Sequence, residues 1–241
     1  MQEKAVAEEK KIGMTETWLR KHRLQFIAAT RHPMLKSIRD GTINLAFFKT
    51  WLAQDYLFVR ALVPFVGSVL TKARKESDDS AHDIEVILKG MASLEDEILW
   101  FKKEADKWVS VFNWVGTHLR YQNGTSDFYS IRPSFLMFLE NLRNENVEYI
   151  VAMTAFWAIE SVYHESFSHC LEEGSKTPEE VKESCERWGN EGFGLYCQSL
   201  QNIVNRCSQK ASEDELKKAE LVLLRVLELE VEFWNMSYAS V

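Results

Sequence analysis

The stretch Ala155-Phe-Trp-Ala-Ile-Glu-Ser-Val-Tyr163 lies within the most apolar run of the chain, which extends from Val147 to Leu171. Polar and apolar residues do not alternate along this run as they would in a half-buried strand, so we expect a helix. Glu160 is the one charged side chain in the quoted stretch. Because burying an unpaired carboxylate is costly, its presence there marks Glu160 as a candidate functional residue.

The rest of the chain also predicts helices. Only four prolines and ten glycines interrupt its 241 residues, and no convincing strand pattern is present. Asn44 or Thr42 can cap the second helix, and Thr177 can cap the sixth with Pro178 at its first position. We expect helices over about 15–30, from 44 into the seventies, over 81–119 with a joint near 90–94, over 133–143 and 147–171, from 177 onward, and over 212–237. The prediction is one all-α domain spanning residues 1–241, with residues 1–13 as a flexible N-terminal tail.

Composition excludes several classes of protein. A net charge of −7 argues against a nucleic-acid-binding protein, which needs clustered Lys and Arg. No apolar run approaches the roughly 20 residues of a membrane helix, so we expect no membrane partner. The four cysteines have no zinc-binding spacing and are too few for a disulfide scaffold, which indicates a reducing compartment and a cytoplasmic location.

Two more acids lie among large apolar residues. Asp55 stands within Trp51–Phe58, and Glu230 stands within Leu227–Trp234, where helical spacing places the neighbouring Glu228 and Glu232 on a different face. Three carboxyl groups from three helices could meet in one pocket that recognises an amidine-like nitrogen ring and transfers protons. Each acid could instead pair with a nearby Arg or Lys, or face solvent.

Metal and haem sites have weaker support. Ferritin-like di-iron sites use Glu and His three residues apart, whereas Glu160 and His164 are four apart, as are Glu165 and His169. His22 or His32 could be an axial haem ligand, although a surface or capping role is commoner. We therefore expect no metal site and no cofactor.

Several motifs, in the right order along most of the chain, resemble the TenA (thiaminase II-like) family. The early ones are His32-Pro33, Asp40-Gly41-Thr42-Ile43 and the segment from Phe48 to Tyr56. Ala155-Phe-Trp-Ala-Ile-Glu160 is similar to the family's Cys-Tyr-Trp helix, and Cys185-Glu-Arg-Trp188 to its Tyr-x-x-Trp segment. The ending Glu230-Val-Glu-Phe-Trp-Asn-Met-Ser resembles the family's Glu-x-x-Phe-Trp-x-Met-Ala.

This resemblance implies a haem-oxygenase-like helical bundle. It also implies hydrolysis of 4-amino-5-aminomethyl-2-methylpyrimidine to the hydroxymethylpyrimidine used in thiamin salvage. By position, Asp55 would bind the amino group and ring nitrogen of the pyrimidine, and Glu230 would be the general acid. Phe58 would stack on the ring without the hydroxyl of the family's tyrosine. The other expected substrate-binding residues are Trp51, Phe156, Tyr163 and Cys185.

The chain departs from the family pattern where Ala155 replaces the catalytic cysteine. It resembles the Glu-containing subclass, which implies action on the aminopyrimidine and its N-formyl derivative with little cleavage of thiamin. We expect Glu160, five residues along the same helix, to be the carboxylate that activates water. The alternative is a pyrimidine-binding or regulatory protein that lost catalysis with the cysteine. In both cases we expect a small pyrimidine ligand and a homo-oligomer.

Overall fold

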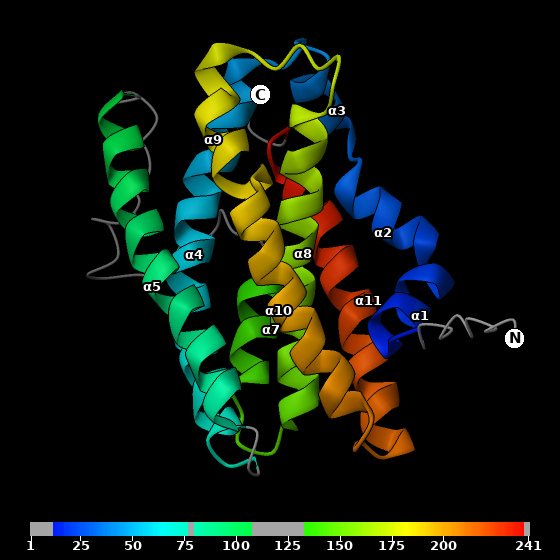
Figure 1. Cartoon of the computed structure of the whole chain (residues 1–241). Helices are drawn as coiled ribbons and strands as arrows, with labels where there is room; N and C mark the ends of the chain where they lie inside the picture. Colours follow the sequence, from blue (N-terminus) through cyan, green and yellow to red (C-terminus); the bar gives the residue numbers. More distant parts are fainter. Residues whose placement is uncertain (1–11, 77–79, 108–132, 239–241) are drawn as a thin grey trace, which may run out of the picture.

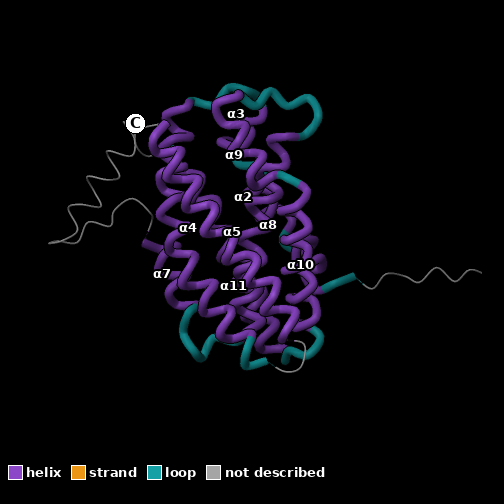
Figure 2. Tube along the Cα trace, turned by 60° about the vertical axis from the view of Figure 1, so that its left-hand side comes forward, coloured by secondary structure: helices purple, strands orange, loops and turns teal. Residues whose placement is uncertain are grey.

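The computed structural model describes residues 12–76, 80–107 and 133–238, which form helices joined by turns and loops (Figure 1). The expected all-α bundle is confirmed. The helices run mostly along the long axis of the molecule (Figure 2). Their bounds are α1 Met14–Lys21, α2 Arg23–Thr30, α3 Pro33–Arg39, α4 Leu45–Ala73, α5 Ser80–Lys107, α7 Pro133–Leu142, α8 Tyr149–Leu171, α9 Glu179–Gly189, α10 Glu191–Ser208 and α11 Glu213–Met236.

Helix α8 is the central element of the bundle. It packs against α2, α3, α4, α9, α10 and α11, and every residue from Tyr149 to Ile159 is buried. A helix that is apolar on all sides can lie stably only where neighbours cover all its faces, and the apolar run of the sequence therefore selects this position. Helix α4 packs against α8 and also against α5, α7 and α11.

The start of α4 confirms the capping prediction for Asn44, and α11 begins with a further side-chain cap. The Asn44 side chain accepts a hydrogen bond from the backbone of Ala46, and Ser212 forms a capping box with Glu215 at the start of α11. The prediction for Thr177 is wrong, because α9 begins at Glu179 with Pro178 as its N-cap residue. The Thr177 hydroxyl donates instead to the backbone oxygen of Cys170, 2.5 Å away.

Three breaks differ from the predicted pattern. The first predicted helix is divided at His22, whose ring lies 2.6 Å from the Glu220 carboxylate on α11. A second break, at Asn190, separates α9 from α10, and the Asn190 side chain caps α10. The joint predicted at 90–94 is absent, because α5 continues unbroken to Lys107 along α4. Residues 108–119, also predicted to be helical, lie outside the described part of the chain.

The N-terminal region and helix α4 differ in part from what the sequence predicts. Residues 1–11 of the predicted tail are outside the described residues, while Gly13 is the N-cap of α1 and lies against Asn205. The statement that no apolar run reaches membrane length is wrong for α4, which is long and apolar enough by length and composition. This is weak evidence for a membrane span, because core helices pass the same test and α4 carries the buried Asp55.

Candidate functional site

Asp55 and Tyr163 join helices α4 and α8 inside the bundle. Asp55 is fully buried, and its Oδ1 accepts a hydrogen bond of 2.5 Å from the Tyr163 hydroxyl. Its other oxygen, Oδ2, is buried without a hydrogen-bond partner among the described residues. Buried polar atoms are almost always paired, so this free oxygen points to a ligand-binding role.

Glu230 on α11 is also fully buried, and neither of its carboxyl oxygens has a partner within the described ranges. The neighbouring acids face outward: Glu228 and Glu232 lie 3.0 Å and 3.9 Å from the guanidinium of Arg225. The prediction that Glu230 points away from Glu228 and Glu232 is therefore confirmed.

Glu160 lies on α8 at a different angle from Ala155. At 3.6 residues per turn, Glu160 is about 140° around the helix from Ala155 but only about 60° from Tyr163. It is partly buried, and burial together with the negative charge of Glu97 raises its pKa to about 8. The charge of Glu160 raises the pKa of both Asp55 and Glu230, and Asp55 also raises that of Glu230, as expected for three acids that lie near one another and are treated below as one acid cluster.

Glu97 on α5 is a fourth acid of this cluster, and the sequence analysis missed it. It is 8% exposed, and its Oε1 accepts a 2.5 Å hydrogen bond from the indole nitrogen of Trp188. Burial raises its pKa to about 7, against the opposing effects of Trp188 and Arg187. Helical spacing could have revealed it, because Glu97 shares a face with the buried Leu94 and Phe101.

The surroundings of the cluster favour the protonated forms of its acids. Burial raises the pKa of Asp55 well above its usual value, and Glu97 and Glu160 raise it further, while the Tyr163 hydrogen bond acts in the opposite direction. Burial, then Asp55 and Glu160, likewise raise the pKa of Glu230. No Lys or Arg forms an ion pair with any of these acids in the described part of the chain, so the ion-pair alternative does not apply.

Aromatic rings surround the acids. Phe58 stacks on Tyr163 with their planes 11° apart and ring centroids 6.3 Å apart. Trp51 contacts Trp188 and Trp234, and its buried indole nitrogen has no partner among the described residues. The structure thus places Trp51, Phe58 and Tyr163, all predicted to bind substrate, in one cluster of aromatic rings.

Two other predicted binding residues have contacts of a different kind. Phe156 packs against Phe65 and Tyr196, beside α10. The free thiol of Cys185 is hydrogen-bonded to the free thiol of Cys170, and this contact and burial raise the pKa of Cys185. Direct contact of Phe156 or Cys185 with substrate stays a prediction.

The two candidate haem ligands have structural partners. His22 pairs with Glu220, while His32 caps α3 through Nδ1 and contacts Asn235 through Nε2 at 3.1 Å. Among the described residues, no group of three or more His, Cys, Asp and Glu side chains is arranged to hold a metal ion.

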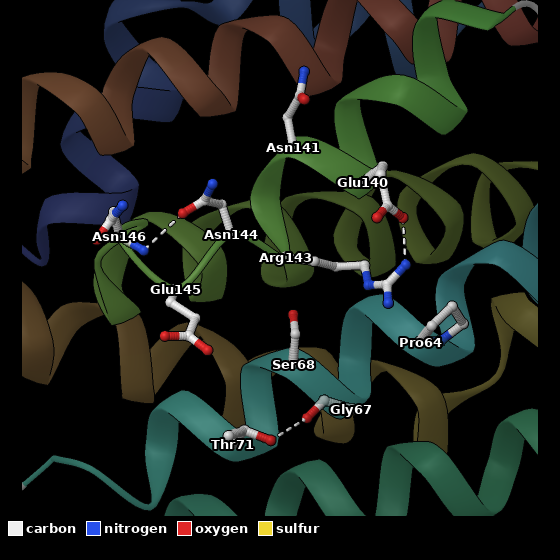
Figure 3. Close-up of a pocket in the computed structure, with 10 residues that line it drawn as sticks. All are labelled: Pro64, Gly67, Ser68, Thr71, Glu140, Asn141, Arg143, Asn144, Glu145 and Asn146. Atoms are coloured by element: carbon white, nitrogen blue, oxygen red, sulfur yellow. Dashed lines mark hydrogen bonds and ion pairs between the residues drawn. The ribbon is translucent and has the colours of Figure 1, made fainter.

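Two open pockets of the described structure lie away from the acid cluster. One of about 730 Å³ lies between α4 and the end of α7 with the residues that follow it (Figure 3). Its polar groups largely satisfy one another: Glu140 pairs with Arg143, the Thr71 hydroxyl bonds to Gly67, and none of its lining residues has a buried unpaired side-chain atom. A smaller pocket of about 430 Å³ lies between α8 and α10. Neither is lined by the clustered acids, so the chemistry favours the enclosed cluster as the functional site.

Comparisons with known proteins agree with this architecture. The model of the TENA/THI-4/PQQC family matches residues 19–109 and 138–240. A probable bifunctional TENA-E protein from Glycine max is 66% identical over 242 residues, covering the whole of both chains. A TenA homologue from Pyrococcus furiosus has a TM-score of 0.75 at 21% identity, covering 93% of this chain and 99% of its own. A TenA family transcription regulator from Silicibacter sp. TM1040 has a TM-score of 0.74 at 14% identity, covering 92% and 95%.

Proposed function

This chain belongs to the TENA/THI-4/PQQC family, in its Glu-containing subclass, and on that premise we propose that it is a hydrolase of an aminopyrimidine formed when thiamin breaks down. The proposed substrates are 4-amino-5-aminomethyl-2-methylpyrimidine and its N-formyl derivative. The proposed product, hydroxymethylpyrimidine, serves thiamin salvage. The relative from Glycine max, which carries TENA-E in its name, supports this assignment.

One observation carries the proposal: Asp55 and Glu230 are fully buried with carboxyl oxygens that have no partner in the described structure. Burial of two unpaired acids costs folding free energy, because their polar atoms lose water and gain no protein partner. A planar nitrogen-rich ligand would supply the missing hydrogen bonds. Perturbed acids in an enclosed site are also typical of catalytic groups.

Asp55 is the proposed recognition group. An aminopyrimidine presents an N–H donor beside a ring-nitrogen acceptor, and a protonated carboxyl group offers one acceptor and one donor in the same spacing. The raised pKa of Asp55 favours that protonated form. Tyr163 fixes the orientation of the carboxyl group through Oδ1, and Phe58 and Trp51 provide flat apolar surfaces for the ring.

Glu160 and Glu230 are the proposed proton-transfer groups. In this mechanism, water attacks the exocyclic carbon of the substrate and its proton passes to the ionised Glu160. The C–N bond breaks, and Glu230 donates a proton to the departing nitrogen, which leaves as ammonia. A proton then returns from Glu160 to Glu230, so that both groups recover their starting states.

A second candidate function, pyrimidine binding without catalysis, is favoured by Ala155, which leaves no thiol at the family's nucleophile position. A structurally similar relative is described as a transcription regulator. Our hydrolase proposal requires no nucleophilic thiol, since the attacking group is water. Because no thiol is present at the nucleophile position, the proposed substrate range excludes efficient cleavage of thiamin. Because the described cysteines are free thiols, we also propose a cytoplasmic location. The family resemblance is the ground for proposing a homo-oligomer.

Product analysis tests the two functions. The purified protein would be incubated with the aminomethyl compound, the N-formyl compound and thiamin, while calorimetry measures the binding of each. Hydrolysis predicts release of ammonia together with hydroxymethylpyrimidine from the aminomethyl compound, release of formate from the N-formyl compound, or both. Saturable binding without any product would support the binding protein and overturn the hydrolase.

A further inference from the structure

The hydroxyl of Tyr196 is enclosed where helices α5, α8 and α10 meet. A Cβ built on Gly90 of α5 would overlap this hydroxyl and would lie 3.5 Å from the ring of Phe156 on α8. The hydroxyl therefore occupies its position only because residue 90 has no side chain. Its oxygen is buried, and no described residue forms a hydrogen bond with it. Buried polar atoms are almost always paired, so this hydroxyl is available to a bound molecule.

Helix α10 packs along the face of α8 that carries Glu160. On α8, Phe156, Glu160 and His164 follow one another at intervals of four residues and so share one face. The ring centroid of Phe193 lies 6.1 Å from that of His164, and the ring centroid of Tyr196 lies 6.5 Å from that of Phe156. Glu160 is one helical turn from each of these contacts and therefore faces α10 between them. Burial, and then the charge of Glu160, raise the pKa of Tyr196 well above its usual value, so its hydroxyl keeps its proton and remains a donor.

The same hydroxyl lies on the side of α5 that faces the acid cluster. Gly90, Leu94 and Glu97 are spaced by four and three residues, so they share one face of α5. Leu94 and Glu97 are both buried, and Glu97 belongs to the acid cluster. Tyr196 thus contacts α5 two turns from Glu97 on the face that the cluster occupies.

Three groups follow one another along α8 in an order that matches the proposed substrate. Tyr163 holds Asp55, the proposed recognition group for the ring. Glu160 lies about 4.5 Å before Tyr163 along the helix axis, and Phe156, which contacts Tyr196, lies about 6 Å before Glu160. A pyrimidine ring held by Asp55 would therefore direct its exocyclic carbon toward Glu160, and any atoms beyond that carbon toward Tyr196.

We propose that Tyr196 is a further catalytic residue, whose free hydroxyl donates a hydrogen bond to the formyl oxygen of the N-formyl substrate. This role rests on the proposed hydrolase function. The aminomethyl compound ends at its amino nitrogen and has no oxygen for the hydroxyl to bind. Tyr196 therefore acts on one of the two proposed substrates and sets the preference between them.

The hydroxyl would act where negative charge develops during the reaction. Water forms a bond to the formyl carbon and gives a proton to the ionised Glu160, while the electron pair of the C=O double bond moves to the formyl oxygen. A fixed donor stabilises this oxyanion. The double bond then re-forms, the C–N bond breaks, and Glu230 donates a proton to the departing nitrogen. The products are formic acid and the aminomethylpyrimidine; a proton returns from Glu160 to Glu230, and Tyr196 keeps its own proton throughout.

Tyr196→Phe tests this role, because it removes the hydroxyl and keeps the ring. The kcat/KM values of the wild type and the variant would be measured by formate release from the N-formyl compound and ammonia release from the aminomethyl compound. We expect the ratio of the first kcat/KM to the second to fall about 100-fold, the scale of a lost oxyanion donor. A merely structural role would lower both values together, and an unchanged ratio would overturn the proposal.

A second variant reaches the same hydroxyl without changing Tyr196. Gly90→Ala places a methyl group where the hydroxyl lies, so the hydroxyl must move and the same ratio should fall. Gly67→Ala is the matched control, because Gly67 also lies within a helix but its added Cβ would meet no atom within 4 Å. The ratio should stay at the wild-type value in this control. A folded Gly90→Ala protein with the wild-type ratio would count against the proposal even if Tyr196→Phe fails to fold.

The outcomes separate this role from the proposed function. Wild-type hydrolysis of the aminomethyl compound alone would leave the proposed function standing and overturn the role of Tyr196. If the wild type hydrolyses neither compound, the proposed function fails, and calorimetry then decides on Tyr196. Tyr196→Phe should weaken binding of the N-formyl compound about tenfold relative to the aminomethyl compound. Equal changes in the two affinities would overturn the contact with the formyl oxygen.

Discussion

The hydroxyl of Tyr163 donates a 2.5 Å hydrogen bond to Oδ1 of Asp55 and thereby connects helices α8 and α4 at the acid cluster. Both residues are buried, and Asp55 keeps its second oxygen free of partners within the described residues. The bond fixes which oxygen faces Tyr163 and which remains available to a ligand. Recognition and fold stability therefore depend on the same contact.

Replacing Tyr163 with Phe should weaken pyrimidine binding about tenfold, which corresponds to about 1.4 kcal/mol, because Asp55 loses the donor that orients it. Calorimetric titration with hydroxymethylpyrimidine would measure the change. Tyr149→Phe is the matched control, since it also removes a buried tyrosine–aspartate hydrogen bond, here the 3.0 Å bond from Tyr149 to Asp83. Equal loss of affinity in both variants would contradict a specific role for the Tyr163–Asp55 contact.

The pH dependence of hydrolysis should follow Glu160. A base works only when ionised, and the pKa of Glu160 is about 8, so kcat/KM should rise with pH, about tenfold per unit, until pH approaches 8. Glu160→Gln should abolish this rise together with most of the activity. Glu165→Gln is the control, because Glu165 lies on the same helix but at the surface, 3.6 Å from Arg31. The pH profile of this variant should match that of the wild type. A flat wild-type profile between pH 6 and 8 would argue against Glu160 as the base.

Stability should change with pH in the opposite sense to activity. The folded-state pKa of Glu160 is raised from 4.5 to about 8, so the folded protein binds an extra proton between these values and loses stability as pH rises through them. Glu160→Gln removes this loss. Thermal unfolding should therefore show a higher Tm for the variant at pH 8 and little difference near pH 4. A constant difference across the range would show that the carboxyl group does not titrate as described.

The sequence predicted the three acids by a simple physical signal, a carboxyl group inside an apolar helical stretch. That signal identified Asp55 and Glu160 directly; for Glu230, whose neighbours Glu228 and Glu232 form a polar face, helical spacing and the family resemblance were needed as well. It missed Glu97, whose neighbours Glu95 and Asp96 give the local sequence the character of a solvated surface. Only the spacing of Leu94, Glu97 and Phe101 on one helix face indicates its burial.

Tertiary contacts explain the errors in helix boundaries. The break at His22 is stabilised by Glu220, which is far away in the sequence. The Thr177 hydroxyl bonds to Cys170 instead of capping α9, again across a loop. Cys185 was predicted to bind substrate from the family resemblance alone. Its thiol is hydrogen-bonded to that of Cys170, a neighbour that no local pattern could identify. Local propensity therefore predicted the helices well and their ends less reliably.

The most direct test of the account is ammonia release from 4-amino-5-aminomethyl-2-methylpyrimidine by the wild type, Glu230→Gln and Glu228→Gln. The last variant is the control, because Glu228 lies at the surface of the same helix beside Arg225. We predict turnover by the wild type and the control, and a loss of at least about 100-fold in Glu230→Gln, the scale expected for a general acid, with pyrimidine binding retained. Undiminished release by Glu230→Gln, or no release by the wild type, would contradict catalysis by buried carboxyl groups.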